Sequence, residues 1–198
     1  MRKRIITISR QFGSGGRSIG KEVAKTLGIA YYDRELIEKV AEKTGLSPDF
    51  IAERGEYSPS KNPFAYSFVD RSINGMSLSD YLYNEQRRVI LELADKEPCV
   101  IVGRCADYIL RERTDCLHAF IHASEEVRAE RIVKLYGESD VAPEKRLHDK
   151  DARRKVNYRH FTGREWGVAQ NYHLTLDSGA LGIEGCVDLI AAAFLREE

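Results

Sequence analysis

The sequence predicts an α/β fold in which a parallel sheet carries helices on both faces. Two patterns predict it: short apolar runs rich in β-branched residues recur along the chain, and segments with helical apolar spacing separate them. Runs without alternation are typical of strands buried on both faces, and such strands need a layer of helices above and below. With 198 residues, 42% of them hydrophobic, the chain suits one packed domain spanning residues 1–198.

Apolar runs predict five strands in this sheet. They cover residues 4–9, 29–32, 99–103, 117–122 and 172–177. Helical spacing predicts helices over residues 18–27, 79–94, 125–136 and 183–195. Gly28 and Gly137 stand where the first and third of these helices should end, and Ser124 is suited to cap the third. Strands and helices that alternate in this way are typical of doubly wound folds.

The composition excludes several classes of protein. The chain carries 31 Lys and Arg against 31 Asp and Glu, so it has no overall field to attract nucleic acid or an anionic membrane. No apolar run approaches the roughly 20 residues of a membrane helix, and the first residues do not resemble a signal peptide. The four cysteines form no CxxC pair and lie in or beside apolar runs. We expect reduced core thiols in a cytoplasmic protein that binds neither nucleic acid nor membrane.

Two segments depart from the alternating pattern. Residues 47–78 contain three of the five prolines and scattered aromatics without a sustained period, which favours a long functional loop or a cap over a site. Residues 142–166 hold eight Lys and Arg against four acidic residues. In a chain without net charge, this local surplus of four indicates where an anionic ligand would bind.

The segment between the first strand and the first helix has a glycine-rich motif. It reads QFGSGGRS and follows the phosphate-binding form GxxxxGK[ST], except that Gln11 replaces the first glycine and Arg17 replaces the lysine. In such loops, backbone N–H groups and a helix N-terminus hold phosphate oxygens, the cation reaches the outer phosphates, and the hydroxyl ligates Mg²⁺. The motif assigns ATP binding to Gly13, Ser14, Gly15, Gly16, Arg17 and Ser18, with Ser18 as the metal ligand. An ordinary glycine-rich turn is the alternative.

Arg17 is the departure with the largest expected consequence. A guanidinium pairs with two phosphate oxygens and keeps its charge, but it is bulkier and less mobile than the ammonium group of lysine. We therefore count Arg17 among the catalytic residues and expect phosphate binding to survive the replacement better than the rate of transfer.

Further motifs extend the pattern over nearly the whole chain. They read YYDRELI, VGRCADYIL, ASEEVRAERI, and DKDARRKVNYRHFTGREWG before NYHLTLDSG. Together with the loop segment ISRQFGSGGRSIG, they make the chain resemble the cytidylate kinase-like family, a branch of the P-loop nucleoside monophosphate kinases. The resemblance implies a P-loop fold with a five-stranded parallel sheet, an acceptor-binding insert at residues 47–78, and an Arg-rich lid at residues 142–166 that closes over ATP.

Acceptor-binding candidates follow the second and third strands. Asp33 and Arg34 lie at the sheet edge where ligands bind in open α/β folds, and by resemblance they face the phosphate acceptor. By resemblance, Arg104 also holds the acceptor, as the arginine of a GRD segment does in cytidylate kinases. The acid of that segment is displaced here to Asp107, which could equally cap a helix. Val102 replaces a second carboxylate of the family, so Asp33 or Asp107 would have to substitute for it.

The basic segment 142–166 supplies the lid candidates. Phosphoryl transfer needs neutralised oxygens, in-line positioning and exclusion of water, which suits a cationic flap that closes over bound substrate. Arg153 and Arg154 are the predicted catalytic arginines of this flap. The alternative is a solvated helix face whose arginines pair with Asp149 and Asp151.

These expectations favour a Mg²⁺-dependent phosphotransferase that moves the γ-phosphoryl group of ATP to a small acceptor, with CMP or dCMP as the first candidates. A catalytically weak or inactive nucleotide-binding module is one alternative, favoured by Gln11, Arg17 and Val102. A kinase for a non-nucleotide metabolite is another, because acceptor choice resides in inserts such as residues 47–78. The sequence leaves the oligomeric state unassigned.

Overall fold

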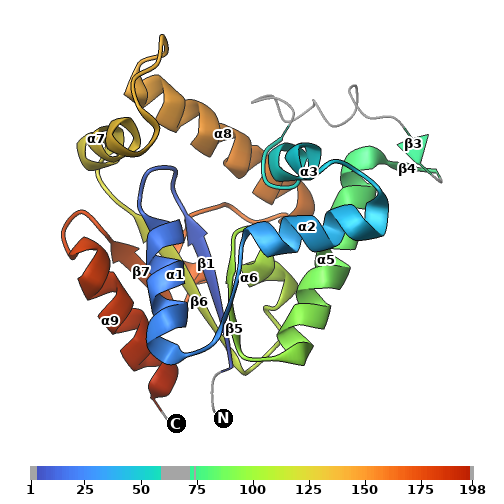
Figure 1. The fold of residues 1–198 in the computed structure, drawn as a ribbon, viewed down its shortest axis with the longest axis horizontal. Coiled ribbons are helices and arrows are strands. Elements are labelled where there is room, and N and C mark those ends of the chain that lie inside the picture. The colour runs from blue at the N-terminus through green and yellow to red at the C-terminus, as the bar shows by residue number, and fades with distance from the viewer. Residues whose placement is uncertain (1–3, 59–71, 74, 197–198) are drawn as a thin grey trace.

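A parallel sheet forms the centre of the fold (Figure 1). The computed structural model describes residues 4–58, 72–73 and 75–196. The strands of the central sheet are β1 (Ile5–Arg10), β2 (Ala30–Tyr32), β5 (Cys99–Val102), β6 (Cys116–His122) and β7 (Leu174–Asp177). Their order is β2-β5-β1-β6-β7, and every neighbouring pair is parallel. The predicted fold class is confirmed, and each predicted strand lies within two residues of an observed one.

Helices cover both faces of the sheet and its carboxyl edge. They are α1 (Gly16–Leu27), α2 (Arg34–Thr44), α3 (Pro48–Arg54), α5 (Leu78–Lys96), α6 (Ala106–Ile109), α7 (Glu125–Tyr136), α8 (Pro143–Thr162) and α9 (Gly182–Leu195). A short hairpin, β3 (Ser72–Ile73) and β4 (Met76–Ser77), precedes α5, and a 3-10 turn (Ala169–Asn171) precedes β7. None of the helices in the described ranges is both long and apolar enough to cross a membrane.

Side chains of the central strands alternate between two separate cores. Ile5 and Ile101 pack with α2 and α5 on one face, whereas Ile6 and Val102 pack with α1 and α9 on the other. Figure 1 shows α1 and α9 side by side against the sheet. Because both faces are covered, apolar residues occupy successive positions, which is why the strands appear as continuous apolar runs in the sequence.

The prediction of an aperiodic loop over residues 47–78 is wrong for its first part. Ser47 caps α3 by accepting a hydrogen bond from the N–H of Phe50 at 3.2 Å, and Pro48 occupies the first turn. The helix has seven residues, which is too short for an apolar period to repeat. Residues 59–71 and 74 of the predicted insert lie outside the described residues.

The predicted lid segment contains a long helix, α8, that crosses the carboxyl edge of the sheet beside α3 and α7 (Figure 1). Its buried side chains are mostly polar and include Asp151, Arg154 and Asn157. The alternative of a solvated face is therefore wrong for this side of the helix. Apolar periodicity could not reveal the packing, because ion pairs and hydrogen bonds replace apolar contacts there.

Candidate active site

The glycine-rich loop lies between the end of β1 and the start of α1. Gly13 and Gly15 have φ angles of 79° and 80°, which only glycine adopts without strain. A Cβ atom at Gly13 would lie 2.8 Å from the carbonyl oxygen of Arg128, and one at Gly16 would lie 2.5 Å from the Cβ of Arg10. The loop therefore needs its glycines for space as well as for backbone conformation.

An open hollow lies over this loop. It is lined by residues 10–13 and 15–18 together with Tyr57, Leu135, Tyr136 and Arg154. The 12-residue helix α1 begins at this loop, so unpaired N–H groups of its first turn favour an anion there. The exposed hydroxyl of Ser18 also borders the hollow and is a suitable oxygen ligand for Mg²⁺. These residues fit a phosphate chain with its metal ion.

Residues distant in sequence hold the loop in place. On α8, the Asp151 carboxylate accepts a hydrogen bond from the N–H of Phe12 at 2.8 Å and pairs with Arg128 of α7 at 2.7 Å. After β7, the hydroxyl of Ser178 donates to the carbonyl of Ser14 at 2.6 Å. The predicted lid helix and the loop are thus in direct contact, which sequence reasoning missed.

Arg17 and Asp33 lie together, whereas Arg34 is separate. The Nε of Arg17 is 2.9 Å from Oδ2 of Asp33, and Oδ1 of Asp33 is buried with no hydrogen-bond partner among the described residues. The Arg34 side chain is 89% exposed and pairs with Glu38 one turn along α2. The structure therefore links the loop cation to the acidic candidate after β2.

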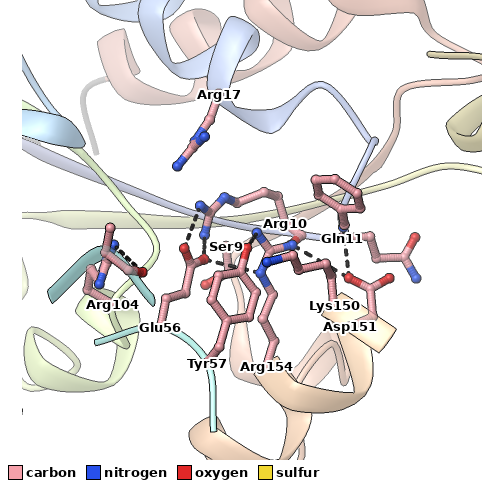
Figure 2. Close-up of polar contacts among 12 residues, drawn as sticks. Ser9, Arg10, Gln11, Arg17, Glu56, Tyr57, Arg104, Lys150, Asp151 and Arg154 are labelled. Atoms are coloured by element: carbon pink, nitrogen blue, oxygen red, sulfur yellow. Dashed lines mark hydrogen bonds and ion pairs between the residues drawn. The ribbon is translucent and has the colours of Figure 1, made fainter. Parts of the chain in front are cut away.

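A second charged group lies beside the loop and is shown in Figure 2. It consists of Arg10, Glu56, Arg104 and Arg154, and we call it the arginine cluster. Both carboxylate oxygens of Glu56 accept hydrogen bonds from Arg10, and Oε1 lies 3.2 Å from Nε of Arg154. All four residues are at most 6% exposed. Burying charges at this density costs free energy unless they are paired and hydrogen-bonded to one another.

The cluster keeps Glu56 ionised. Burial by itself would raise the pKa of this carboxyl group, but the guanidinium groups of Arg10, Arg154 and Arg104 outweigh burial and hold its pKa far below the ordinary range. Burial also lowers the pKa of Arg104. Sequence reasoning missed Arg10 and Glu56. A charged residue ending an otherwise apolar strand was the available signal for Arg10, and nothing comparable indicated Glu56.

Arg104 reaches α3 from a strained backbone position. Its φ angle is 59° and that of Cys105 is 54°, both in the left-handed region that costs a non-glycine residue about 1–2 kcal/mol. The Arg104 guanidinium donates to the carbonyl oxygens of Ile51 at 2.8 Å and Ala52 at 3.3 Å. Strain of this kind is typical of functional sites, where surrounding contacts maintain it.

The predicted lid arginines bind the segment that follows α3. Arg154 donates to the hydroxyl of Tyr57 at 2.8 Å, and Arg153 donates to the carbonyl of Ser58 at 2.7 Å. Arg153 also pairs with Glu53 on α3. The structure therefore shows α8 held to residues 53–58, with Arg154 in the arginine cluster.

Asp107 is engaged inside the fold. Its carboxylate accepts hydrogen bonds from Ser9 at 3.1 Å and from Tyr158 at 2.6 Å, and burial raises its pKa. Both oxygens are buried and hydrogen-bonded within the protein, and the contact of Asp107 with an acceptor stays a prediction. Asp107 is also not the N-cap of α6, because Cys105 holds that position. Val102 is buried at the end of β5, so no carboxylate stands there.

Fold and site together define the class. The central strand of the parallel sheet leads through a glycine-rich loop into a helix, and cationic side chains lie around that loop. This arrangement is a P-loop nucleotide-binding fold. The chain belongs to the cytidylate kinase-like family, whose family model matches residues 5–180.

Individual relatives agree with this family. The cytidylate kinase of Archaeoglobus fulgidus is 28% identical over 193 residues, which cover 95% of this chain and 93% of that one. An uncharacterized protein from Eubacterium ventriosum has a solved structure with a TM-score of 0.74, 25% identity and 98% coverage of both chains. Shikimate kinase from Bacteroides thetaiotaomicron shares the fold at a TM-score of 0.55 and 17% identity, over 96% of this chain and 97% of that one. The protein is thus a kinase for a nucleotide or another small molecule.

Proposed function

We propose that the protein transfers the γ-phosphoryl group of ATP to a nucleoside monophosphate, with CMP or dCMP as the first candidates. One observation carries the proposal: three buried guanidinium groups gather directly beside the phosphate-binding loop. The loop suits the phosphates of a donor, and the arginine cluster suits a second phosphate next to them. Two adjacent anion sites are what phosphoryl transfer between two phosphorylated molecules requires.

The loop side would hold the donor. N–H groups of the loop and the first turn of α1 bind the donor's oxygens, and Arg17 adds a positive charge. Ser18 would ligate Mg²⁺, which when bound neutralises charge on the phosphate oxygens. Arg154 borders the hollow over the loop and a second hollow lined by Arg10, Glu56 and Arg104, and it would stabilise charge on the migrating group. Arg153 holds the segment after α3 in place.

The acceptor side would bind the nucleoside monophosphate. Its phosphate is already anionic at neutral pH, so an acceptor oxygen can attack the γ-phosphorus without a general base, and ADP leaves with the electrons of the broken bond. Arg104 would hold this phosphate. The unpartnered Oδ1 of Asp33 is an acceptor for a substrate hydroxyl, and Asp33 and Arg34 line a further open hollow together with Arg17.

A catalytically weak nucleotide-binding module is the second candidate. The ion pair between Arg17 and Asp33 favours it, because the loop cation is engaged away from the donor phosphates. The substitution Arg17→Lys separates the two candidates. For a working kinase adapted to arginine, the lysine variant loses the pairing geometry and transfer falls about tenfold; a rise in transfer would instead indicate an impaired enzyme.

The test of the proposed function is transfer of labelled γ-phosphate from ATP to a panel of nucleoside monophosphates, nucleosides and small hydroxylated metabolites. Reactions without acceptor and without magnesium are the controls. We expect transfer to CMP or dCMP and none to cytidine, which lacks the phosphate. Transfer to an unphosphorylated metabolite would mean that the acceptor is such a metabolite and not a nucleoside monophosphate. No transfer to any acceptor would support the nucleotide-binding module.

A further inference from the structure

We propose that Glu56 is an internal substitute for the acceptor phosphate: its carboxylate fills the anion site formed by Arg10, Arg104 and Arg154, and the incoming phosphate displaces it. The inference deepens the proposed function and rests on it, because the displacing ligand is the acceptor. Glu56 would then compete with the acceptor phosphate and lower the affinity of the site for it.

The contacts of Glu56 are those of a bound anion. Arg10 ends β1 directly before the phosphate-binding loop and donates to both carboxylate oxygens (Figure 2). Arg154 comes from α8, and Arg104 follows β5 and lines the same hollow as Glu56. Guanidinium groups of two distant elements therefore contact one carboxylate, as they would contact a phosphate. The Arg104 guanidinium is hydrogen-bonded to Ile51 and Ala52 and lies close enough to help lower the pKa of Glu56.

The carboxylate does not satisfy the cluster. Although Nε of Arg154 lies 3.2 Å from Glu56, it has no hydrogen-bond partner among the described residues, and this side chain is 6% exposed. Including the neighbouring pair Arg128 and Asp151, four guanidinium groups face two carboxylates, which leaves a net charge of two. A phosphate monoester carries about two negative charges at neutral pH and three strong acceptor oxygens. A phosphate would thus match the cluster better than the carboxylate does.

Two glycines maintain space for this arrangement. A Cβ atom at Gly103 would overlap the guanidinium of Arg10, and one at Gly55 would overlap that of Arg104. A small hollow borders Glu56 and the three arginines. The two glycines therefore give the guanidinium groups of Arg10 and Arg104 the space that they occupy, next to the hollow where the acceptor phosphate would enter.

Displacement of Glu56 would also affect the insert and the lid helix. Glu56 follows α3, and the next two residues, Tyr57 and Ser58, are hydrogen-bonded to Arg154 and Arg153 of α8. The carboxylate thus connects this segment to β1 through Arg10. When phosphate takes its place, that connection is released, so binding of the acceptor is coupled to the position of the segment.

The test uses inorganic phosphate as the probe. Thermal unfolding of the wild type, Glu56→Gln and Asp115→Asn is measured across a phosphate titration, with sodium chloride at matched ionic strength as the control for screening. Asp115 pairs with Arg113 before β6, outside the arginine cluster. We expect Glu56→Gln to unfold at a lower temperature than the wild type without phosphate, and to bind phosphate at least about tenfold more tightly. Asp115→Asn should bind it as the wild type does.

Glu56→Asp is the second variant, because it keeps the charge but shortens the side chain. We expect an intermediate gain in phosphate affinity. If Glu56→Gln folds only when phosphate is present, the inference is supported. Equal phosphate affinity in the wild type and both Glu56 variants would overturn it, because Glu56 would then be a fixed counter-ion. Phosphate bound at the glycine-rich loop is common to all the proteins and does not affect this comparison.

The two proposals fail in different ways. Transfer to CMP together with unchanged phosphate affinity in the Glu56 variants would refute this inference and leave the proposed function intact. Absence of transfer would refute the proposed function, while the phosphate titration would still show whether Glu56 occupies an anion site.

Discussion

The glycine-rich loop and the arginine cluster, which we propose as two anion-binding regions, are built in opposite ways. The glycine-rich loop offers backbone N–H groups from consecutive residues and opens to solvent through its hollow. The arginine cluster is made of buried side chains from β1, the end of β5 and α8, with Glu56 between them. A backbone site depends on local sequence, whereas a side-chain site exists only once distant segments have packed. The loop should therefore fail when its local geometry changes, and the cluster when a charge is lost.

The largest effect is expected for Gly13→Ala in the loop. An added Cβ would meet the carbonyl oxygen of Arg128, and the φ angle of 79° would be strained. We expect phosphoryl transfer to fall about 1000-fold, as for loss of a preorganised oxyanion site. The matched control is Gly28→Ala, where φ is also positive at 65° but no atom lies within 4 Å. That variant should lose about 1 kcal/mol of stability and keep its activity. Similar activity in the two variants would show that the loop geometry is not needed.

Arg104→Met tests the arginine cluster separately from the loop. Loss of a charge-assisted contact to a buried phosphate should lower kcat/KM for the acceptor about 100-fold, with the Kd for ATP unchanged. Steady-state kinetics and ATP titration measure the two effects. Arg88→Met, on an exposed arginine of α5, is the control. An equal loss of ATP affinity in Arg104→Met would mean that the two regions are not separate sites.

Asp151→Asn should affect both regions at once. Asp151 accepts the N–H of Phe12 in the loop and also faces Arg128 and Arg154. Removal of its charge leaves buried guanidinium groups uncompensated, so the free energy of unfolding should fall by about 3 kcal/mol. Urea denaturation checks this value, with the exposed Asp188→Asn as control. Because Asp151 contacts both regions, the KM for ATP and the KM for the acceptor should both rise. A rise in only one of them would mean that Asp151 does not connect the two regions.

Asp115 provides a charged pair remote from both regions and the smallest expected effect. Hydrogen bonds from Arg113 lower the pKa of Asp115. A carboxyl group with a lowered folded-state pKa contributes stability above its unfolded pKa of about 4, and loses it as the pH falls through the folded value. Asp115→Asn should therefore cost at most about 1 kcal/mol at neutral pH.

Urea denaturation of the wild type and Asp115→Asn at a series of pH values measures this difference, which should shrink below about pH 4. The KM values for ATP and acceptor should stay unchanged. A difference in stability that grows on acidification would contradict the sign of the shift.

The sequence predicted the loop because eight consecutive residues, Gln11 to Ser18, carry the whole pattern. It predicted the strands because burial on both faces leaves uninterrupted apolar runs. Arg104 was found through the resemblance of its motif, and Arg154 through local charge. The contact between Arg10 and Glu56 could not be predicted, because the two residues are 46 positions apart and Glu56 belongs to no motif.

Buried polar packing explains the remaining differences. The inner face of α8 presents Asp151, Arg154 and Asn157, so an apolar pattern could not show that the helix packs against the loop. Asp107 was expected near the acceptor because it resembles, two positions displaced, the acid of the GRD segment in cytidylate kinases. Instead, hydrogen bonds from Ser9 and Tyr158 hold it inside the fold, and spacing alone does not determine on which side of a turn a carboxylate lies.

The central claim is that the donor phosphates bind at the loop and the acceptor phosphate binds at the arginine cluster. A crystal structure of the protein with ADP and CMP tests it most directly. We predict that the ADP phosphates contact N–H groups of residues 13–18, that the CMP phosphate contacts Arg10, Arg104 and Arg154, and that the Glu56 carboxylate has left the cluster. A CMP phosphate bound elsewhere, with the pair between Arg10 and Glu56 intact, would contradict the claim.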